Sequence, residues 1–216
     1  MCLFNDKIQR KSTYIPNGVY RKQPATRTDY IEKLGLQPQK YILAVGRITQ
    51  EKGFDYLIDS YVQSLPHDFK LVLAGGVDHN SSYSSEISER AQKQNVIMPG
   101  YVDGEFLRQL YSHARLFVLP SYNEGLPIAI LEAMSYSHPI ISTPVGGIPE
   151  VVKDHQNGIL VEPGNLEQIK EALLFFIKHP EVIENYGQKS YEIVQPYFPE
   201  NVFLQLKKIY YDLLEK

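Results

Sequence analysis

Short apolar runs and longer stretches with helical apolar spacing alternate along most of the 216-residue chain. Continuous apolar runs bounded by turn residues are typical of strands buried on both faces of a parallel sheet. The pattern predicts strands at 41–46, 70–76, 116–119, 138–143 and 157–161, and a short strand and turn at 96–102. It predicts helices at 54–64, 84–94 (polar and exposed), 105–113, 128–134, 166–178, 180–194 and 200–215. This alternation predicts right-handed βαβ units, and therefore an α/β fold with a doubly wound parallel sheet and helices on both faces.

Glycine, proline and polar residues follow four of the predicted strands at the points where those strands end. They are Gly46-Arg47, Gly75-Gly76, Gly100-Tyr101 and Pro120-Ser121. The carboxyl ends of parallel strands share one edge of the sheet, and ligands of open α/β sheets bind beyond that edge. We therefore expect these four turns to face one crevice that binds a ligand.

The stretch from 116 to 134 combines a strand, a turn and the start of a helix. Gly125 lets the backbone approach a ligand, and Pro127 suits a first helical turn, where its missing N–H has no intrahelical partner. The positive end of this helix favours an anion, and the carboxylates of Glu124 and Glu132 can accept hydrogen bonds from sugar hydroxyls. The alternative is that Glu124 is a helix-dipole charge and Glu132 a solvated one. Glu132 lies among apolar neighbours, however, where a charge needs a partner.

Two cations follow the first predicted strand: Arg47 directly, and Lys52 just before Gly53. A guanidinium fork and a point charge together suit a diphosphate. Residues of these types at such positions are also often plain surface charges. Because neither residue falls on an obvious solvated helix face, we favour the diphosphate.

The bulk composition permits one sizeable domain, with or without an appendage, because 43% of the residues are hydrophobic. The formal net charge of -3 gives no argument for nucleic acid as a partner. No apolar run approaches the length of a membrane span. Cys2 is the only cysteine, which excludes an intramolecular disulfide and fits a reducing compartment, so we expect a cytoplasmic protein.

Residues 1–28 carry six basic residues against Asp6 alone and show no clear helical or strand period. Such an arm is compatible with peripheral contact to anionic lipid or to a polyanionic acceptor, but its composition favours a solvated linker. We expect three parts: a basic linker or arm at 1–28, a Rossmann-like domain at 29–195, and a C-terminal amphipathic helix at 196–216.

Several motifs with a known mechanism are absent from the sequence. G-x-G-x-x-G is missing, which argues against a nicotinamide dehydrogenase, and the lack of G-x4-G-K-[ST] excludes a P-loop. The chain has neither Asp-x-Asp, the usual clamp between a metal and a diphosphate, nor histidines with ligand spacing, so no metal site is predicted. A G-x-S-x-G elbow is also missing. A retaining glycosidase needs two carboxyl groups about 5 Å apart. Glu124 and Glu132 lie eight positions apart, which disfavours this separation and therefore a hydrolytic pair.

Five segments together resemble one protein family. Glu124-Gly125-Leu126-Pro127-x4-Glu132-Ala133-Met134 resembles the E-x7-E signature of the retaining GT-B glycosyltransferases, the glycogen synthase and mannosyltransferase-like group often called family 4. The other matching segments are Ile15-Pro16-Asn17-Gly18-Val19, Gly46-Arg47-x4-Lys52-Gly53, Pro99-Gly100-Tyr101-Val102 and Val145-Gly146-Gly147-Ile148-Pro149-Glu150. Ser137 stands where the family usually has glycine, which bears on the local turn geometry.

This resemblance implies that the chain is the donor-binding half of a hexosyltransferase with the GT-B fold. Such an enzyme transfers a sugar from a nucleoside diphosphate sugar to a glycan, lipid or other acceptor with retention, as in polysaccharide biosynthesis. About half of the enzyme normally precedes these segments, so the N-terminal acceptor domain is expected to be missing. The alternative is a stand-alone nucleotide-sugar binding module that a partner chain completes.

The resemblance also assigns roles to individual residues. Arg47 and Lys52 would neutralise the leaving diphosphate, Glu124 would meet the sugar, and Glu132 would hold the ribose. No metal or other cofactor would be required. Backbone groups would complete the site, with Gly46, Gly125, Leu126 and Pro127 near the phosphates and Tyr101 and Val102 near the base.

Overall fold

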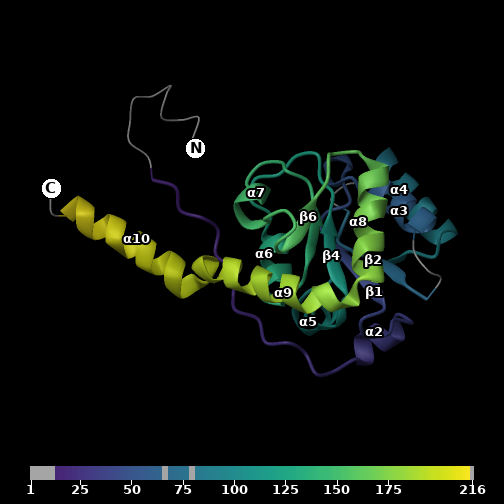
Figure 1. The fold of residues 1–216 in the computed structure, drawn as a ribbon, viewed down its shortest axis with the longest axis horizontal. Coiled ribbons are helices and arrows are strands. Elements are labelled where there is room, and N and C mark those ends of the chain that lie inside the picture. Colours follow the sequence, from purple (N-terminus) through teal and green to yellow (C-terminus); the bar gives the residue numbers. More distant parts are fainter. Residues whose placement is uncertain (1–12, 65–67, 78–80, 215–216) are drawn as a thin grey trace.

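The computed structural model describes residues 13–64, 68–77 and 81–214, with a six-stranded sheet at the centre (Figure 1). The strands are β1 (Tyr41–Val45), β2 (Lys70–Ala74), β3 (Ile97–Gly100), β4 (Leu116–Leu119), β5 (Ile140–Ser142) and β6 (Gly158–Leu160). Their order is β3-β2-β1-β4-β5-β6, and every neighbouring pair is parallel. Because the strand order reverses direction at β1 and β4, the predicted doubly wound α/β fold is confirmed.

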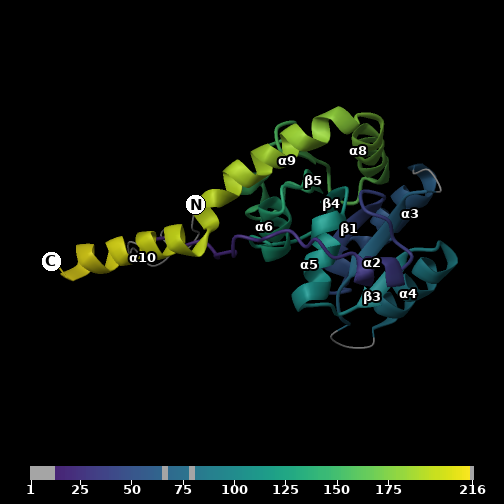
Figure 2. The same cartoon turned by 90° about the horizontal axis from the view of Figure 1, so that it is seen from below.

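Helices cover both faces of this sheet (Figures 1 and 2). One face carries α3 (Phe54–Ser64), α4 (Ser82–Lys93) and α8 (Leu166–Lys178). The other carries α5 (Gly104–His113), α6 (Ile128–Ser135), the short α7 (Ile148–Val151) and α9 (Pro180–Val194). Right-handed crossovers require this layering for α3 to α7, because the chain first winds from β1 to β3 and then returns to β4 and continues to β6.

The central strands form because their side chains are apolar toward both faces of the sheet. Residues 41–44 of β1 and all of β4 are buried, as expected for strands covered on both sides. Tyr41 brings a hydroxyl into this core, and it donates to the carbonyl oxygen of Leu110 (2.6 Å). Burial of both strands fixes the edge at which the turns after β1 and β4 meet.

Two helices differ from the predicted pattern. α4 is not a fully exposed polar helix, because Ile87 and Ala91 are buried. α2 (Asp29–Lys33) is absent from the pattern, since five residues are too few to show a period. It is held by Gln109 of α5, which accepts from the Tyr30 N–H (2.9 Å) and donates to Asp29 (3.0 Å).

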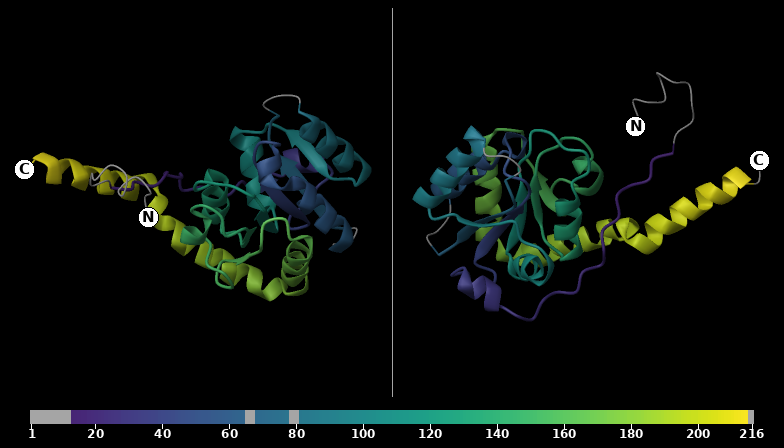
Figure 3. Two further views of the ribbon diagram at one scale, coloured as in Figure 1. Left: turned by 90° about the horizontal axis from the view of Figure 1, so that it is seen from above. Right: turned by 180° about the vertical axis from the view of Figure 1, so that it is seen from behind.

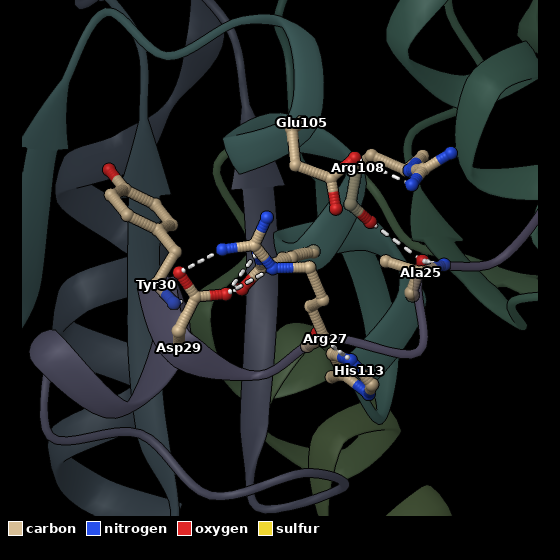
Figure 4. A network of polar contacts seen from close by, with 9 residues as sticks. Ala25, Arg27, Asp29, Tyr30, Glu105, Arg108 and His113 are labelled. Carbon is tan, nitrogen blue, oxygen red and sulfur yellow. Dashed lines mark hydrogen bonds and ion pairs between the residues drawn. The ribbon is translucent and has the colours of Figure 1, made fainter.

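The chain between 19 and 28 lies against the domain, unlike the solvated linker that its composition favours. The N–H of Val19 donates to the carbonyl oxygen of Tyr197 (2.8 Å), and the N–H of Ala25 donates to Ser112 Oγ (2.7 Å). Figure 4 shows the second of these anchors, together with His113 beside Arg27. The predicted basic arm also includes residues 1–12, with Lys7, Arg10 and Lys11, which lie outside the described residues.

The turn after α6 keeps the geometry that a glycine would supply there. Ser137 has a φ of 61°, in the left-handed region that favours glycine. It is exposed, so its side chain adds no clash. The departure from the family pattern at this position therefore leaves the turn intact.

The last helix, α10 (Pro199–Leu214), extends away from the sheet and its helices (Figures 1, 2 and 3). It is amphipathic as predicted, but none of its described residues is buried, and Phe203 and Leu213 are largely exposed. Glu215, the predicted last residue of this helix, lies outside the described residues. Within the described part of the chain, no helix has both the length and the apolar character needed to span a bilayer.

Candidate functional site

The loop that follows β4, residues 120–127, is held in place from both sides. The N–H of Tyr122 donates to the carbonyl oxygen of Glu51 (2.7 Å), in the turn after β1. The N–H of Gly147 donates to the carbonyl oxygen of Gly125 (2.6 Å), from the loop after β5. The carboxyl ends of β1, β4 and β5 therefore form one connected edge, as expected at the position where the strand order reverses.

Gly146 allows the loop after β5 to approach this β4 loop very closely. Its φ is 56°, and a Cβ atom there would lie 2.0 Å from the carbonyl oxygen of Glu124. No side chain fits such a space without moving the backbone. The glycine pair of the predicted G-G-x-P-E segment therefore shapes the backbone at Glu124 and Gly125.

Helix α6 starts at Ile128 as predicted, but Pro127 is its N-cap residue with an extended backbone rather than a residue of its first turn. Among the described residues, no side-chain hydrogen bond caps this end. Pro127 has no N–H, so the donors near this helix end come from its neighbours. The positive end of the helix dipole points toward Gly125 and Leu126, which suits an anion.

Lys52 and Glu124 form a largely buried ion pair. The Lys52 Nζ lies 2.6 Å from Glu124 Oε1, and the two side chains are 13% and 9% exposed. Ser121 Oγ donates to the same carboxylate oxygen (2.7 Å). Glu124 is therefore not a simple charge at a helix end, because it is bonded to the loop after β1 and to its own loop.

Arg47 lies on the same turn as Lys52 but in a more exposed position. Its side chain is 60% exposed, and Nη2 lies 3.7 Å from the carboxylate of Glu51. The stem of Lys52 passes close to Gly46, where an added Cβ would lie 3.7 Å from Lys52 Cε. The structure thus brings Gly46, Lys52 and Glu124 together. The Arg47 side chain lies on the same turn and is largely exposed to solvent.

Glu132 faces a separate small cavity between α5 and α6. Its Oε2 accepts a hydrogen bond from the Tyr111 hydroxyl (3.3 Å), and its Oε1 lies 3.3 Å from the Nζ of Lys22. The cavity has a volume of about 240 Å³ and is lined by Lys22, Gly104, Leu107, Arg108, Tyr111, Glu132 and Tyr136. The partner that an embedded carboxylate requires is thus supplied by the N-terminal arm and by a tyrosine.

Tyr111 is fixed as a hydrogen-bond donor by its surroundings. It stacks on Tyr136, with ring centroids 5.2 Å apart and an interplanar angle of 4°. Burial, and then the negative charge of Glu132, raise the pKa of Tyr111 well above its ordinary value. The same two causes raise the pKa of Tyr136 to about 12. Both rings are therefore neutral at physiological pH, and the Tyr111 hydroxyl donates to Glu132.

Tyr101 and Val102 lie in the turn between β3 and α5, close in sequence to Gly104, which lines this small cavity. Tyr101 is 75% exposed, so its ring is not part of the core. Sequence patterns did not indicate Lys22, Tyr111 or Tyr136 as neighbours of Glu132. The only signal for them was the need of an embedded carboxylate for a partner.

A larger cavity lies between the turn after β1, the start of α3 and Tyr122 of the β4 loop. Its volume is about 530 Å³, and it is lined by Thr49, Gln50, Glu51, Asp55, Tyr56 and Tyr122. None of the sequence-predicted site residues lines it. Of those residues, Gly46, Lys52 and Glu124 come together at the turns after β1 and β4, and Glu132 of α6 lines the smaller cavity. Tyr101 and Val102 line neither of these two cavities.

Comparisons with known proteins bear on the family. A family model described as "Glycosyl transferases group 1" matches residues 26–193. The alpha-galactosylglucosyldiacylglycerol synthase of Streptococcus pneumoniae is 32% identical over 219 residues, which cover 96% of this chain and 56% of that protein. A glycosyltransferase of Methanocaldococcus jannaschii, MJ1607, is 30% identical over 85% of this chain and 48% of its own length. The chain thus spans about half the length of the curated relatives it matches.

Solved structures give the same result for the fold. The sucrose-phosphate synthase of Thermosynechococcus elongatus superposes with a TM-score of 0.80 at 29% identity, over 93% of this chain and 52% of that one. The C-terminal domain of a group 1 glycosyl transferase, LpcC of Francisella tularensis, has a TM-score of 0.71 at 25% identity, over 82% of this chain and 96% of that domain. The chain belongs to the group 1 glycosyltransferases and corresponds to the C-terminal domain of a GT-B fold.

Proposed function

We propose that this chain is the donor-binding half of a retaining glycosyltransferase that uses a nucleoside diphosphate sugar and transfers a hexose-type sugar. The observation that carries the proposal is the pairing of Lys52 with Glu124 beside the start of α6, with Glu132 further along the same helix. A cation, a helix end and two carboxylates on one edge match the anionic and hydroxyl-rich parts of such a donor.

In this proposal Arg47 and Lys52 neutralise the diphosphate as it leaves, helped by the positive end of α6. Preorganised charges of this kind are usually the largest contribution to catalysis. Glu132 binds the ribose hydroxyls, while Tyr101 and Val102 lie beside the base. Glu124 meets hydroxyls of the sugar. We infer that Arg47 and Lys52 take the place of a divalent metal beside the diphosphate, so that neither metal nor cofactor is required.

In this proposal the acceptor-binding groups belong to a separate N-terminal half of the enzyme. Both halves are proposed to lie in the cytoplasm. The proposed division of the chain is an arm at 1–28, a nucleotide-sugar-binding domain at 29–195 and a helical segment at 196–216. The alternative, a stand-alone module completed by a partner chain, predicts the same donor binding. The proposed acceptor is a glycan, a lipid or another molecule. A lipid is suggested by the name of the S. pneumoniae relative, whose sequence matches nearly all of this chain.

The test is a thermal-shift and calorimetric screen of UDP-, GDP- and ADP-sugars, with and without EDTA. UDP is the first choice because a GT-B neighbour, Anabaena HepE, has been solved with UDP-glucose. A ligand at one hundred times its dissociation constant should stabilise the fold by about 2.7 kcal/mol. Binding that disappears in EDTA would contradict the metal-free site, and sugar transfer by the purified chain alone would contradict the half-enzyme.

Arg47→Ala is expected to weaken binding of a nucleoside diphosphate about tenfold or more, while binding of the matching nucleoside stays nearly unchanged. The reason is that Arg47 makes a charge-assisted contact to phosphate alone. Glu132→Ala should weaken both ligands by a similar factor, because both carry the ribose. Calorimetry of both ligands measures this difference, and Lys40→Ala, at an exposed pair with Asp68, is the control. Equal effects of Arg47→Ala on the two ligands would refute its assignment.

Glu124→Gln is expected to remove the preference of the domain for the nucleotide sugar over the bare diphosphate. A hydrogen bond to a charged acceptor contributes about 1.5–3 kcal/mol, and the amide is a weaker acceptor. Affinity for the bare diphosphate should stay the same or rise, because Lys52 no longer has a carboxylate beside it. The measured quantity is the ratio of the two affinities in wild type and variant. An unchanged ratio would mean that Glu124 has only a structural role.

A further inference from the structure

Residues 19–27 of the arm run beside the Glu132 cavity as a strap that is fixed on both sides of Lys22. Upstream, the Val19 N–H is bonded to Tyr197 and the Val19 side chain is buried. Downstream, Ala25 is bonded to Ser112 of α5, and the Arg27 carbonyl oxygen lies 2.8 Å from the Nε2 of His113 (Figure 4). Lys22 lies midway between these anchors, so its backbone position is set by the fold.

Two adjacent cations on this strap have different partners. The Nζ of Lys22 lies 3.3 Å from Glu132 Oε1, and the side chains of this pair are 28% and 20% exposed. Arg21 instead pairs with Glu200 (3.2 Å), with both side chains more than half exposed, and its guanidinium lies over the Phe198 ring. Of these two cations, Lys22 lines the cavity that Glu132 faces and Arg21 does not.

We propose that Lys22 is a positioning residue of the donor site, which holds the Glu132 carboxylate for the ribose hydroxyls and closes one wall of the nucleoside cavity. This inference rests on the proposed function, in which Glu132 binds the ribose. Lys22 and Tyr111 each hold one carboxylate oxygen. Because a carboxylate has about four lone-pair sites, two remain for two neighbouring hydroxyls. Lysine only donates, so it leaves the acceptor role to Glu132.

The test compares two probes, UDP and 2′,3′-dideoxy-UDP, which differ only in the ribose hydroxyls. Wild type should prefer UDP. Lys22→Ala should lose about tenfold in affinity for UDP and change little for the dideoxy probe, because the lost contact acts through Glu132. Lys22→Arg should restore most of the UDP affinity. Arg21→Ala, the matched control next to it, should leave both affinities unchanged.

Several results would overturn this role. Equal losses for both probes in Lys22→Ala would mean that Lys22 contacts phosphate or supports the fold in general. A gain in UDP affinity would mean that the strap masks Glu132 and competes with the ribose. Wild-type preference for UDP that survives Lys22→Ala would overturn this inference alone. If wild type binds none of UDP, GDP and ADP, the proposed function fails, and this inference fails with it.

Discussion

Gly146→Ala is expected to reduce the affinity for a nucleotide sugar more than hundredfold and to destabilise the fold by about 1–3 kcal/mol. The new methyl group would lie 2.0 Å from the carbonyl oxygen of Glu124 and 2.6 Å from that of Gly125. Both are backbone atoms, so the β4 loop itself must move, and overpacking of this kind typically costs 1–3 kcal/mol. A loop shifted by even an ångström no longer places its N–H groups and Glu124 for the donor.

The matched control for this variant is Gly35→Ala. Gly35 also has a left-handed backbone, with a φ of 69°, but an added Cβ there would meet nothing within 4 Å. It should therefore show only the conformational cost of alanine in the left-handed region, about 1–2 kcal/mol, with unchanged ligand affinity. Calorimetry and chemical denaturation measure both quantities. If Gly146→Ala binds the donor as Gly35→Ala does, then the close approach of the two loops does not shape the site.

Lys52→Met is expected to reduce both donor affinity and stability. In the proposed site the Lys52 ammonium contacts phosphate, so its loss should reduce affinity by about ten- to a hundredfold. Loss of the ion pair leaves the Glu124 carboxylate, which is only 9% exposed, with the Ser121 hydroxyl as its hydrogen-bond donor. Breaking a fully buried pair costs about 3–5 kcal/mol, so we expect about 2–3 kcal/mol for this slightly exposed one.

The double variant Lys52→Met with Glu124→Gln separates these two effects. It removes the uncompensated charge, so its unfolding free energy should return most of the way to that of wild type. Its affinity for the nucleoside diphosphate should stay low, because the cation is still absent. A double variant no more stable than Lys52→Met would show that the ion pair is not what stabilises the loop. If Lys52→Met binds the nucleoside diphosphate with wild-type affinity, Lys52 is not part of the phosphate site.

The parts of the fold that follow from sequence are those in which a single apolar pattern decides the outcome. α3 and α8 begin and end at the predicted residues, because their buried faces repeat with helical spacing over several turns. α2 could not be found in this way, since its five residues are held by Gln109 of a distant helix. The start of α6 at Ile128 was predicted, but Pro127 was assigned to the first turn and is the N-cap instead, a difference of one position at a helix end.

The candidate site was predictable as a set of strand ends but not as a set of contacts. Sequence assigned Lys52 to phosphate and Glu124 to sugar, and the fold joins them across 72 positions in an ion pair. The apolar neighbours of Glu132 in the sequence indicated that its carboxylate needs a partner, but not that Lys22 of the arm supplies it. Such contacts depend on how distant loops meet in space, and local residue patterns carry no information on that.

The most direct test of the central claim is an amide chemical-shift titration of the chain with the nucleotide sugar that binds best in the screen. The account predicts the largest shifts at Gly46, Gly125 and Glu132, at the ends of β1 and β4 and on α6, and little change along α10. Shifts confined to the larger cavity around Tyr56 and Tyr122, with none at Gly125 or Glu132, would contradict it.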